Sequence, residues 1–111
     1  GPTDGESVDY PDFANALADA LADDPEAQGV AVCGSGIGIS IALNRHRHVR
    51  AALVHDVTGA TLTRQHNDAN VVAFGERLIG IETAKDALAA FLGTAFEGGR
   101  HERRVAKLSP R

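Results

Sequence analysis

Apolar residues recur along the first part of the chain with the period of a helix. Phe13, Leu17 and Leu21 stand four positions apart, with alanines beside them, and predict an amphipathic helix between residues 9 and 25. Pro11 and the acidic residues around it are typical of a helix start, because proline tolerates the first turn and acidic groups favour the positive end of the helix dipole. The first expected element is therefore a helix with one apolar face.

The rest of the chain alternates short apolar runs with helical patterns. Uninterrupted apolar runs predict three strands buried on both faces, at residues 29–33, 49–54 and 70–74. Helical spacing predicts four more helices, at residues 37–44, 58–66, 83–92 and between 99 and 108. This alternation is typical of a parallel sheet covered by helices on both sides. We therefore expect residues 1–111 to form a single α/β domain, a three-layer, doubly wound, Rossmann-like sheet.

Composition narrows the class of protein. A length of 111 residues suits one domain, and a hydrophobic content of 43% supports a packed core. The formal net charge of -4 gives no reason to expect nucleic acid or an anionic membrane as a partner. A lone cysteine excludes an intrachain disulfide framework, and no apolar stretch is long enough for a membrane span. A cytoplasmic protein is the simplest expectation.

Cys33 and the glycines that follow it are the first candidate site. Gly34, Gly36 and Gly38 stand between a predicted strand and a predicted helix, where backbone N–H groups can hold an anion. The spacing misses the dinucleotide fingerprint because Ile39 replaces its third glycine, and the Gly-Lys pair of nucleoside-triphosphate loops is absent. Cys33 ends its strand where open α/β sheets bind ligands, and the adjacent helix favours a thiolate. The alternative is a small buried hydrophobe before a tight turn.

Two further clusters carry polar chemistry. His66 and Asn67 follow a predicted helix and can offer a proton carrier and an amide donor to one ligand, unless His66 only caps that helix. Arg100 and Arg104 share a helix face that can bind a phosphate, although a solvated basic face is the usual explanation of such a run. His46, His48 and His55 predict no metal site, because cations alternate with the histidines in residues 45–48.

Taken together and in this order, these clusters resemble the type B ribose-5-phosphate isomerase family, which also contains isomerases of galactose and allose phosphates. The matching segments cover almost the whole chain and are residues 9–11, 33–42, 64–71, 74–77 and 97–101. The resemblance implies interconversion of ribose 5-phosphate and ribulose 5-phosphate through an enediolate, a step of the pentose phosphate pathway. An isomerase of another sugar phosphate (galactose, allose or a tetrose phosphate) and a non-catalytic sugar-phosphate binding module remain open alternatives.

The resemblance also assigns roles to individual residues. Cys33 aligns with the base that moves a proton between C2 and C1 of the open-chain sugar, Ser35 with the hydroxyl that assists it, and His66 with the residue that opens the furanose ring. Family members that use a different base carry Glu where Ile37 stands here, so the chain resembles the cysteine type. The substrate-binding residues implied by the resemblance are Tyr10, Gly34, Gly36, Ile37, Gly38, Asn67, Arg77, Arg100 and Arg104. The amides of residues 34–38 would hold the enediolate, and the arginines would hold the phosphate.

The resemblance has consequences for cofactors and partners as well. No metal and no cofactor are expected, in keeping with the missing nicotinamide-binding fingerprint. A homodimer or a tetramer of dimers is implied, with part of the phosphate clamp supplied by the other subunit. Family members begin with a strand, a helix and a second strand that have no counterpart here. We therefore expect a truncated isomerase whose sheet lacks an interior strand, with the activity belonging to the parent enzyme.

Overall fold

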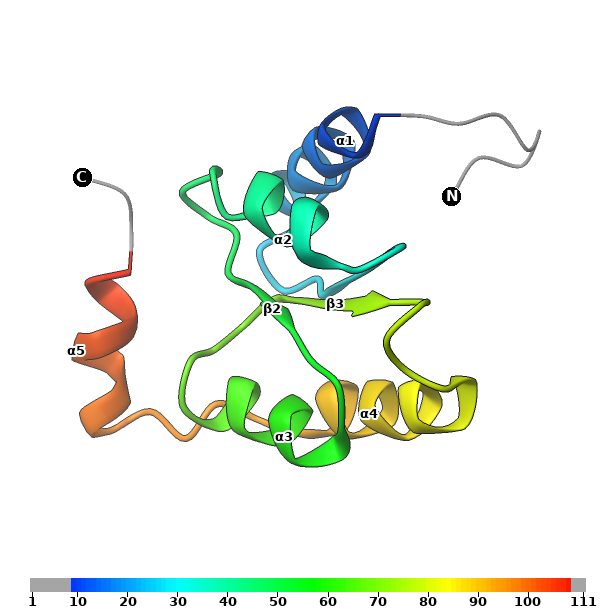
Figure 1. The fold of residues 1–111 in the computed structure, drawn as a ribbon. Coiled ribbons are helices and arrows are strands. Elements are labelled where there is room, and N and C mark those ends of the chain that lie inside the picture. Colours follow the sequence, from blue (N-terminus) through cyan, green and yellow to red (C-terminus); the bar gives the residue numbers. More distant parts are fainter. Residues whose placement is uncertain (1–8, 109–111) are drawn as a thin grey trace.

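The computed structural model describes residues 9–108, and its elements follow the predicted order (Figure 1). Within these residues the helices are α1 (Tyr10–Asp23), α2 (Ile37–Leu43), α3 (Val57–Gln65), α4 (Ile81–Gly93) and α5 (Arg100–Ala106). The strands are β1 (Gly29–Cys33), β2 (Ala51–Leu53) and β3 (Val71–Gly75). All of the predicted elements are therefore present, with ends that differ by a few residues.

The strands form one parallel sheet in the order β1-β3-β2. In this register Cys33 at the end of β1 lies beside Gly75 at the end of β3, and Leu53 of β2 lies beside Ala73. Helices α1 and α2 cover one face of the sheet, and α3 and α4 cover the other (Figure 1). The fold is thus the three-layer, doubly wound α/β arrangement that the alternation of strands and helices predicted.

The layer of α1 and α2 packs through small residues on α1. Pro11 lies in the first turn of α1, where a missing N–H costs no helical hydrogen bond. Ala14 and Ala18 are fully buried, so α2 can approach α1 closely. Ile39 and Leu43 of α2 then fill the space between the two helices and the sheet. This packing fixes α2, and with it the glycine-containing turn that leads into α2.

Helix α3, which with α4 forms the second helical layer, begins one residue earlier than predicted. Asp56 accepts a hydrogen bond from the backbone N–H of Gly59 at 2.6 Å, so its carboxylate caps α3 and the helix starts at Val57. On α4, Ala87 and Phe91, which are four positions apart on one helix face, are fully buried against the sheet. The helix ends and the core positions therefore follow from local chemistry that is visible in the sequence.

Strand β1 differs from the expectation of burial on both faces. Ala31 is buried beneath α1 and α2, but Val30 and Val32 on the opposite side are 40% and 54% exposed. Helices α3 and α4 pack over β3 and β2, and within residues 9–108 they leave these two valines open. The strand predicted from the apolar run is therefore present, but the prediction that both of its faces are buried was wrong. The hydropathy of a strand does not show which other element covers each of its faces.

Strand β2 is shorter than the predicted run at 49–54. Val49 donates its N–H to His46 in a turn, and the N–H of Arg50 is taken by the side chain of Asn70 at 2.7 Å. Pairing with β3 therefore begins only at Ala51. Val49 and Val54 are buried nonetheless, so the apolar pattern marked core positions beyond the strand itself.

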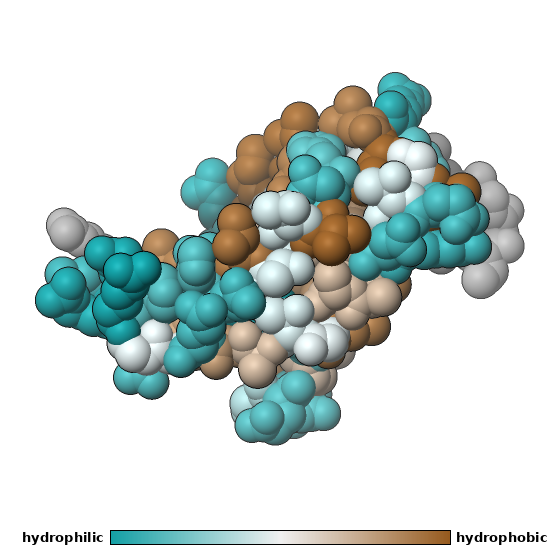
Figure 2. All heavy atoms as spheres, turned by 90° about the horizontal axis from the view of Figure 1, so that it is seen from below, coloured by the Kyte–Doolittle hydropathy of each residue, from teal (hydrophilic) through white to brown (hydrophobic). Residues whose placement is uncertain are grey.

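The surface over α3 and α4 mixes apolar and polar side chains (Figure 2). Val57 and Leu62 of α3 are less than half exposed, whereas Ile81 at the start of α4 is 69% exposed. The region of α5, at the left of the view, is hydrophilic. No helix in the described part of the chain is both long and apolar enough to cross a membrane.

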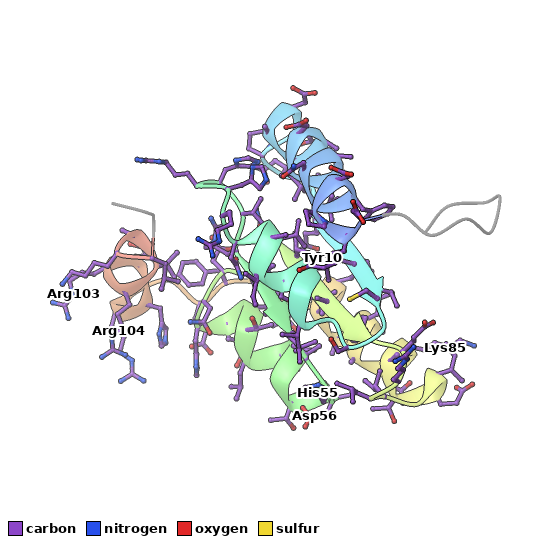
Figure 3. All side chains as sticks on the ribbon, turned by 45° about the horizontal axis from the view of Figure 1, so that its top comes forward. Tyr10, His55, Asp56, Lys85, Arg103 and Arg104 are labelled. Atoms are coloured by element: carbon purple, nitrogen blue, oxygen red, sulfur yellow. The ribbon has the colours of Figure 1, made fainter. Side chains whose placement is uncertain are left out.

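Helix α5 lies beside the sheet and covers neither of its faces (Figure 1). The chain reaches it through Gly98 and Gly99, which have φ angles of 70° and 57°, a region that favours glycine. Arg103 and Arg104 extend from α5 on the side away from Tyr10 (Figure 3). Arg100 and Arg104, two of the three arginines predicted to bind phosphate, are therefore carried by an element that stands apart from the layered body.

Candidate functional site

The thiol of Cys33 lies half-buried at the carboxyl end of β1. The backbone N–H of Gly36 donates a hydrogen bond to its Sγ at 3.1 Å. Gly36 has a φ of 76°, and a Cβ there would lie 2.5 Å from Cδ1 of Leu53, so only glycine makes this turn without displacing its neighbours. This N–H fixes the position of the sulfur at the mouth of the turn.

The amides of the turn are only partly available to a ligand. The N–H of Gly36 is used by the thiol, and the N–H of Ile37 donates to Ser35 Oγ at 3.2 Å. Among residues 9–108, the N–H groups of Gly34, Ser35 and Gly38 have no acceptor. The expected anion hole over residues 34–38 therefore has free donors at both of its ends.

An open hollow brings six of the predicted site residues together. It is lined by Tyr10, Cys33, Gly34, Ser35, Gly38, Arg77 and Leu78. The ring of Tyr10 rests directly on Gly38, where a Cβ would lie 2.8 Å from Cζ of the ring. The Arg77 guanidinium lies over Gly34, with its Nε 3.7 Å from where a Cβ would stand. A ligand at the thiol would therefore meet an aromatic ring and a cation.

Gly75, which was not among the predicted site residues, holds the turn in place from β3. A Cβ at Gly75 would lie 2.3 Å from the carbonyl oxygen of Ser35, so the two backbones are as close as glycine allows. The N–H groups of Glu76 and Arg77 donate to the carbonyl oxygens of Cys33 and Gly34 at 2.9 and 3.0 Å. A glycine directly after an apolar run was the available sequence signal for this close approach.

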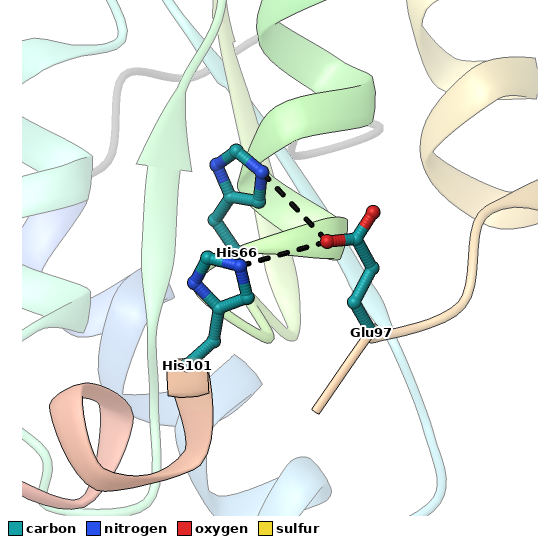
Figure 4. A group of neighbouring side chains, drawn as sticks. All are labelled: His66, Glu97 and His101. Atoms are coloured by element: carbon teal, nitrogen blue, oxygen red, sulfur yellow. Dashed lines mark ion pairs between the residues drawn. The ribbon is translucent and has the colours of Figure 1, made fainter. Parts of the chain in front are cut away.

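A second cluster forms around His66, the residue that ends α3. Its Nε2 lies 3.9 Å from Oε1 of Glu97, and Nε2 of His101 lies 3.5 Å from the same oxygen (Figure 4). The two imidazole rings are stacked, with centroids 4.4 Å apart and planes 16° from parallel. The cluster thus joins the end of α3, the loop after α4 and the first turn of α5.

The imidazole of His101 is the more buried of the two. Burial lowers the pKa of His101, because the charged form loses hydration there. Neighbouring His66, Arg100 and Arg104 lower the pKa in the same direction, and the Glu97 carboxylate opposes them. His101 is therefore biased toward its neutral form, in which one ring nitrogen keeps a free lone pair.

The turn after His66 owes its shape to charged residues. Arg64 donates to Asp68 Oδ1 at 3.0 Å and to the carbonyl oxygen of Ala69 at 2.7 Å. Arg50 donates to the carbonyl oxygen of Asp68 at 2.7 Å, which holds Asp68 at a φ of 48°. The quoted motif at residues 64–71 therefore contains structural residues as well as His66.

The remaining predicted residues lie near this second cluster or on α5. Asn67 is exposed and lines a cavity of its own beside β2. Arg100 and Arg104 are exposed on α5, and among the described residues neither forms an ion pair. Glu97 and His101 were not predicted as site residues, although their spacing of four was visible in the sequence.

The two clusters lie at opposite ends of the parallel sheet. Cys33 stands at the carboxyl end of β1, level with Gly75 at the carboxyl end of β3. His66 precedes the amino end of the same strand β3. The five residues of β3 span about 13 Å along the strand. Cys33 and His66 of one chain therefore cannot reach the same small molecule.

Comparison with known proteins gives consistent results. Residues 1–108 match the sequence pattern of a family described as Ribose/Galactose Isomerase. Ribose-5-phosphate isomerase B of Escherichia coli is 44% identical over 98% of this chain and 73% of its own length. D-erythrulose-4-phosphate isomerase of Pectobacterium atrosepticum is 42% identical over 94% of this chain and 68% of its own. A crystal structure of a Thermotoga maritima ribose 5-phosphate isomerase superposes with a TM-score of 0.94 at 45% identity, covering 98% and 75%.

Proposed function

Because the chain belongs to the ribose/galactose isomerase family, we propose that it interconverts ribose 5-phosphate and ribulose 5-phosphate. The observation that carries this proposal is the surroundings of the Cys33 sulfur. The thiol accepts an N–H at 3.1 Å and lines the same hollow as the turn whose Gly34 and Ser35 amides are free. An aldose-ketose isomerase needs this pairing of one base with fixed donors for a developing oxyanion.

In the proposed reaction, the Cys33 thiolate removes the proton from C2 of the open-chain aldose. The electron pair forms the C1–C2 double bond, and the C1 carbonyl oxygen takes the negative charge of an enediolate. The N–H groups of Gly34 and Ser35 hydrogen-bond to the enediolate oxygen. The proton then passes from sulfur to C1, and the hydroxyl proton moves from O2 to O1, which gives the ketose. No electron leaves the substrate, so the chemistry needs no redox cofactor.

Because Cys33 and His66 of one chain lie too far apart to act on the same substrate, the proposed active site must draw residues from two chains. We infer that a second copy places its His66, Arg100 and Arg104 against the hollow around Cys33 of the first copy. Helix α5 carries two of these residues and packs on neither face of its own sheet, so it is free to lie against a partner. The protein is then a homodimer, or a tetramer built from such dimers, with two sites at each interface.

Mixing two inactive variants tests this arrangement. If Cys33→Ala and His66→Ala chains are unfolded and refolded together, half of the dimers contain one chain of each kind. Each such dimer has one intact site, so about a quarter of wild-type activity should return. Refolding each variant alone is the control. A mixture that stays as inactive as the separate variants would contradict a site shared between two chains.

Arg104 is expected to bind the substrate phosphate. Arg104→Ala should raise the KM for ribose 5-phosphate roughly ten- to a hundredfold, because a charge-assisted hydrogen bond to phosphate contributes roughly 1.5–3 kcal/mol. The matched control is Arg103→Ala, which removes the same charge from the next residue of α5. Steady-state kinetics of both variants decide the matter. An unchanged KM in Arg104→Ala, or an equal rise in both variants, would remove Arg104 from the phosphate site.

A second candidate function is the isomerisation of another sugar phosphate. It is favoured by the relative named D-erythrulose-4-phosphate isomerase, which is 42% identical to this chain. Turnover of four-, five- and six-carbon aldose phosphates, compared as kcat/KM, distinguishes the two functions. The proposal requires the highest value for ribose 5-phosphate.

The proposed chemistry also bears on location. A catalytic thiolate must stay reduced, and the half-buried Cys33 lines an open hollow where oxidants can reach it. The cytoplasm keeps such thiols reduced, whereas oxidising compartments favour disulfides. We therefore place the enzyme in the cytoplasm.

A further inference from the structure

The side chains around Glu97 form a group that the proposed proton transfer at Cys33 does not use. Among residues 9–108, the ligand atoms of His66, Glu97 and His101 all lie within 4.8 Å of one another. They offer two imidazole nitrogens and one carboxylate oxygen, and both Nε2 atoms point to the same side of the carboxylate (Figure 4). None of the three side chains has a hydrogen-bond partner elsewhere in the described chain, so their lone pairs remain available.

The distances in this group are close to those of a metal centre. Ligand atoms 2.0–2.1 Å from a tetrahedral ion lie roughly 3.3 Å from one another. The two nitrogen-to-oxygen distances are 3.5 and 3.9 Å and all three ligand atoms lie within 4.8 Å of one another, so coordination requires the side chains to draw together by up to about 1.5 Å. Glu97 is half exposed on a loop and can supply that movement, while the buried His101 is held in place.

The donor set selects a class of ion. Two imidazoles and one carboxylate suit zinc and its neighbours, whereas magnesium and calcium prefer sites made of oxygen ligands. Three protein ligands leave a fourth position for water or another small ligand.

The charges around the group limit how tightly an ion is held. The Glu97 carboxylate supplies one negative charge, while Arg100 and Arg104 lie close enough to act on His101 and repel a cation. Because two guanidinium groups outweigh one carboxylate, the affinity for a cation is low enough for the bound ion to exchange with solution. A permanent structural metal would need a more negative ligand set.

We propose that His66, Glu97 and His101 form an exchangeable binding site for a divalent transition-metal ion of the zinc class. Occupation of the site ties up the nitrogen of His66 and brings two positive charges to the group. Insofar as the proposed function holds, zinc would then act as a reversible inhibitor that a chelator relieves. The binding itself does not depend on that function.

Zinc binding to the Cys33→Ala chain, measured by calorimetry, tests the proposal without a contribution from the thiol. We expect one ion per chain, and at least about tenfold weaker binding in Glu97→Gln and in His101→Gln. Glu102→Gln, which removes the same charge from an exposed residue of α5, is the matched control and should bind as before. Glu97→Gln keeps the test decisive should the buried His101 variant fold poorly.

Cobalt supplies an independent readout of the same site. Visible absorption of bound Co²⁺ reports nitrogen and oxygen ligands, and it should be lost in Glu97→Gln. Absence of binding by zinc and cobalt, or binding that both cluster variants retain, would overturn the proposal. Zinc binding that persists while the enzyme proves inactive on sugar phosphates would contradict the proposed function and leave the metal site standing.

Discussion

Replacing Cys33 with alanine is expected to lower kcat for ribose 5-phosphate about a thousandfold, the range typical of losing a general base. The side chain that accepts the proton from C2 is then gone, and no other thiol exists in the chain. The free amides of Gly34 and Ser35 remain, so binding of the sugar phosphate should survive. Steady-state kinetics and a direct binding measurement on one preparation separate these two effects.

A Cys33→Ser variant is the matched control for the loss of the base. Its hydroxyl can still accept the N–H of Gly36, as the sulfur does at 3.1 Å. A hydroxyl is a far weaker proton acceptor at neutral pH, so this variant should be nearly as inactive as the alanine variant. Wild-type turnover in either variant would assign the proton transfer to another residue. A wild-type chain that binds sugar phosphates without turnover would be a binding module.

Replacing Gly75 with alanine is expected to lower the free energy of unfolding by about 3 kcal/mol, at the upper end for overpacking. The new Cβ would lie 2.3 Å from the carbonyl oxygen of Ser35 and 2.8 Å from its Cα. These are backbone atoms, which cannot rotate aside as a side chain can. The turn carrying Cys33 must move instead, so activity should fall together with stability. Urea unfolding monitored by circular dichroism measures the change.

Gly93→Ala controls for the general effect of adding a methyl group to a glycine. Gly93 lies at the end of α4, and a Cβ there would meet nothing within 4 Å. Alanine is the better helix former, so this variant should be unchanged or up to about 1 kcal/mol more stable. Equal stability of Gly75→Ala and the wild type would show that the backbone at Ser35 can move away from residue 75 at no cost in stability.

The sequence was sufficient for the order and type of elements because apolar spacing reflects which side of each element faces a core. The cap at Asp56 and the buried Phe91 follow from residues local to their own helices. The exposure of Val30 and Val32 does not, since the covering of a strand depends on residues far along the chain. Features that depend on residues within one element were therefore predictable, whereas contacts between elements far apart in the sequence were not.

The candidate site shows the same division. Cys33 was predicted at a ligand-binding edge because a parallel sheet collects the carboxyl ends of its strands there. The sequence did not show that Gly36 would give its N–H to the thiol, which depends on the geometry of the turn. Nor did it show that His101 would stack on His66 beside Glu97, since the three residues lie on α5, at the end of α3 and in the loop between α4 and α5.

The placement of Cys33 and His66 at opposite ends of one sheet also determines how damage spreads. Each reaction centre of the proposed dimer draws residues from both chains, so no single chain contains a complete reaction centre. A copy damaged at one end only can still complete the centre of a healthy neighbour with its other end, so a mixed dimer keeps one of its two centres. In a cell making both an intact and a defective form, activity would therefore fall only in proportion to the intact copies, and a copy damaged at both ends would be needed to disable its neighbour.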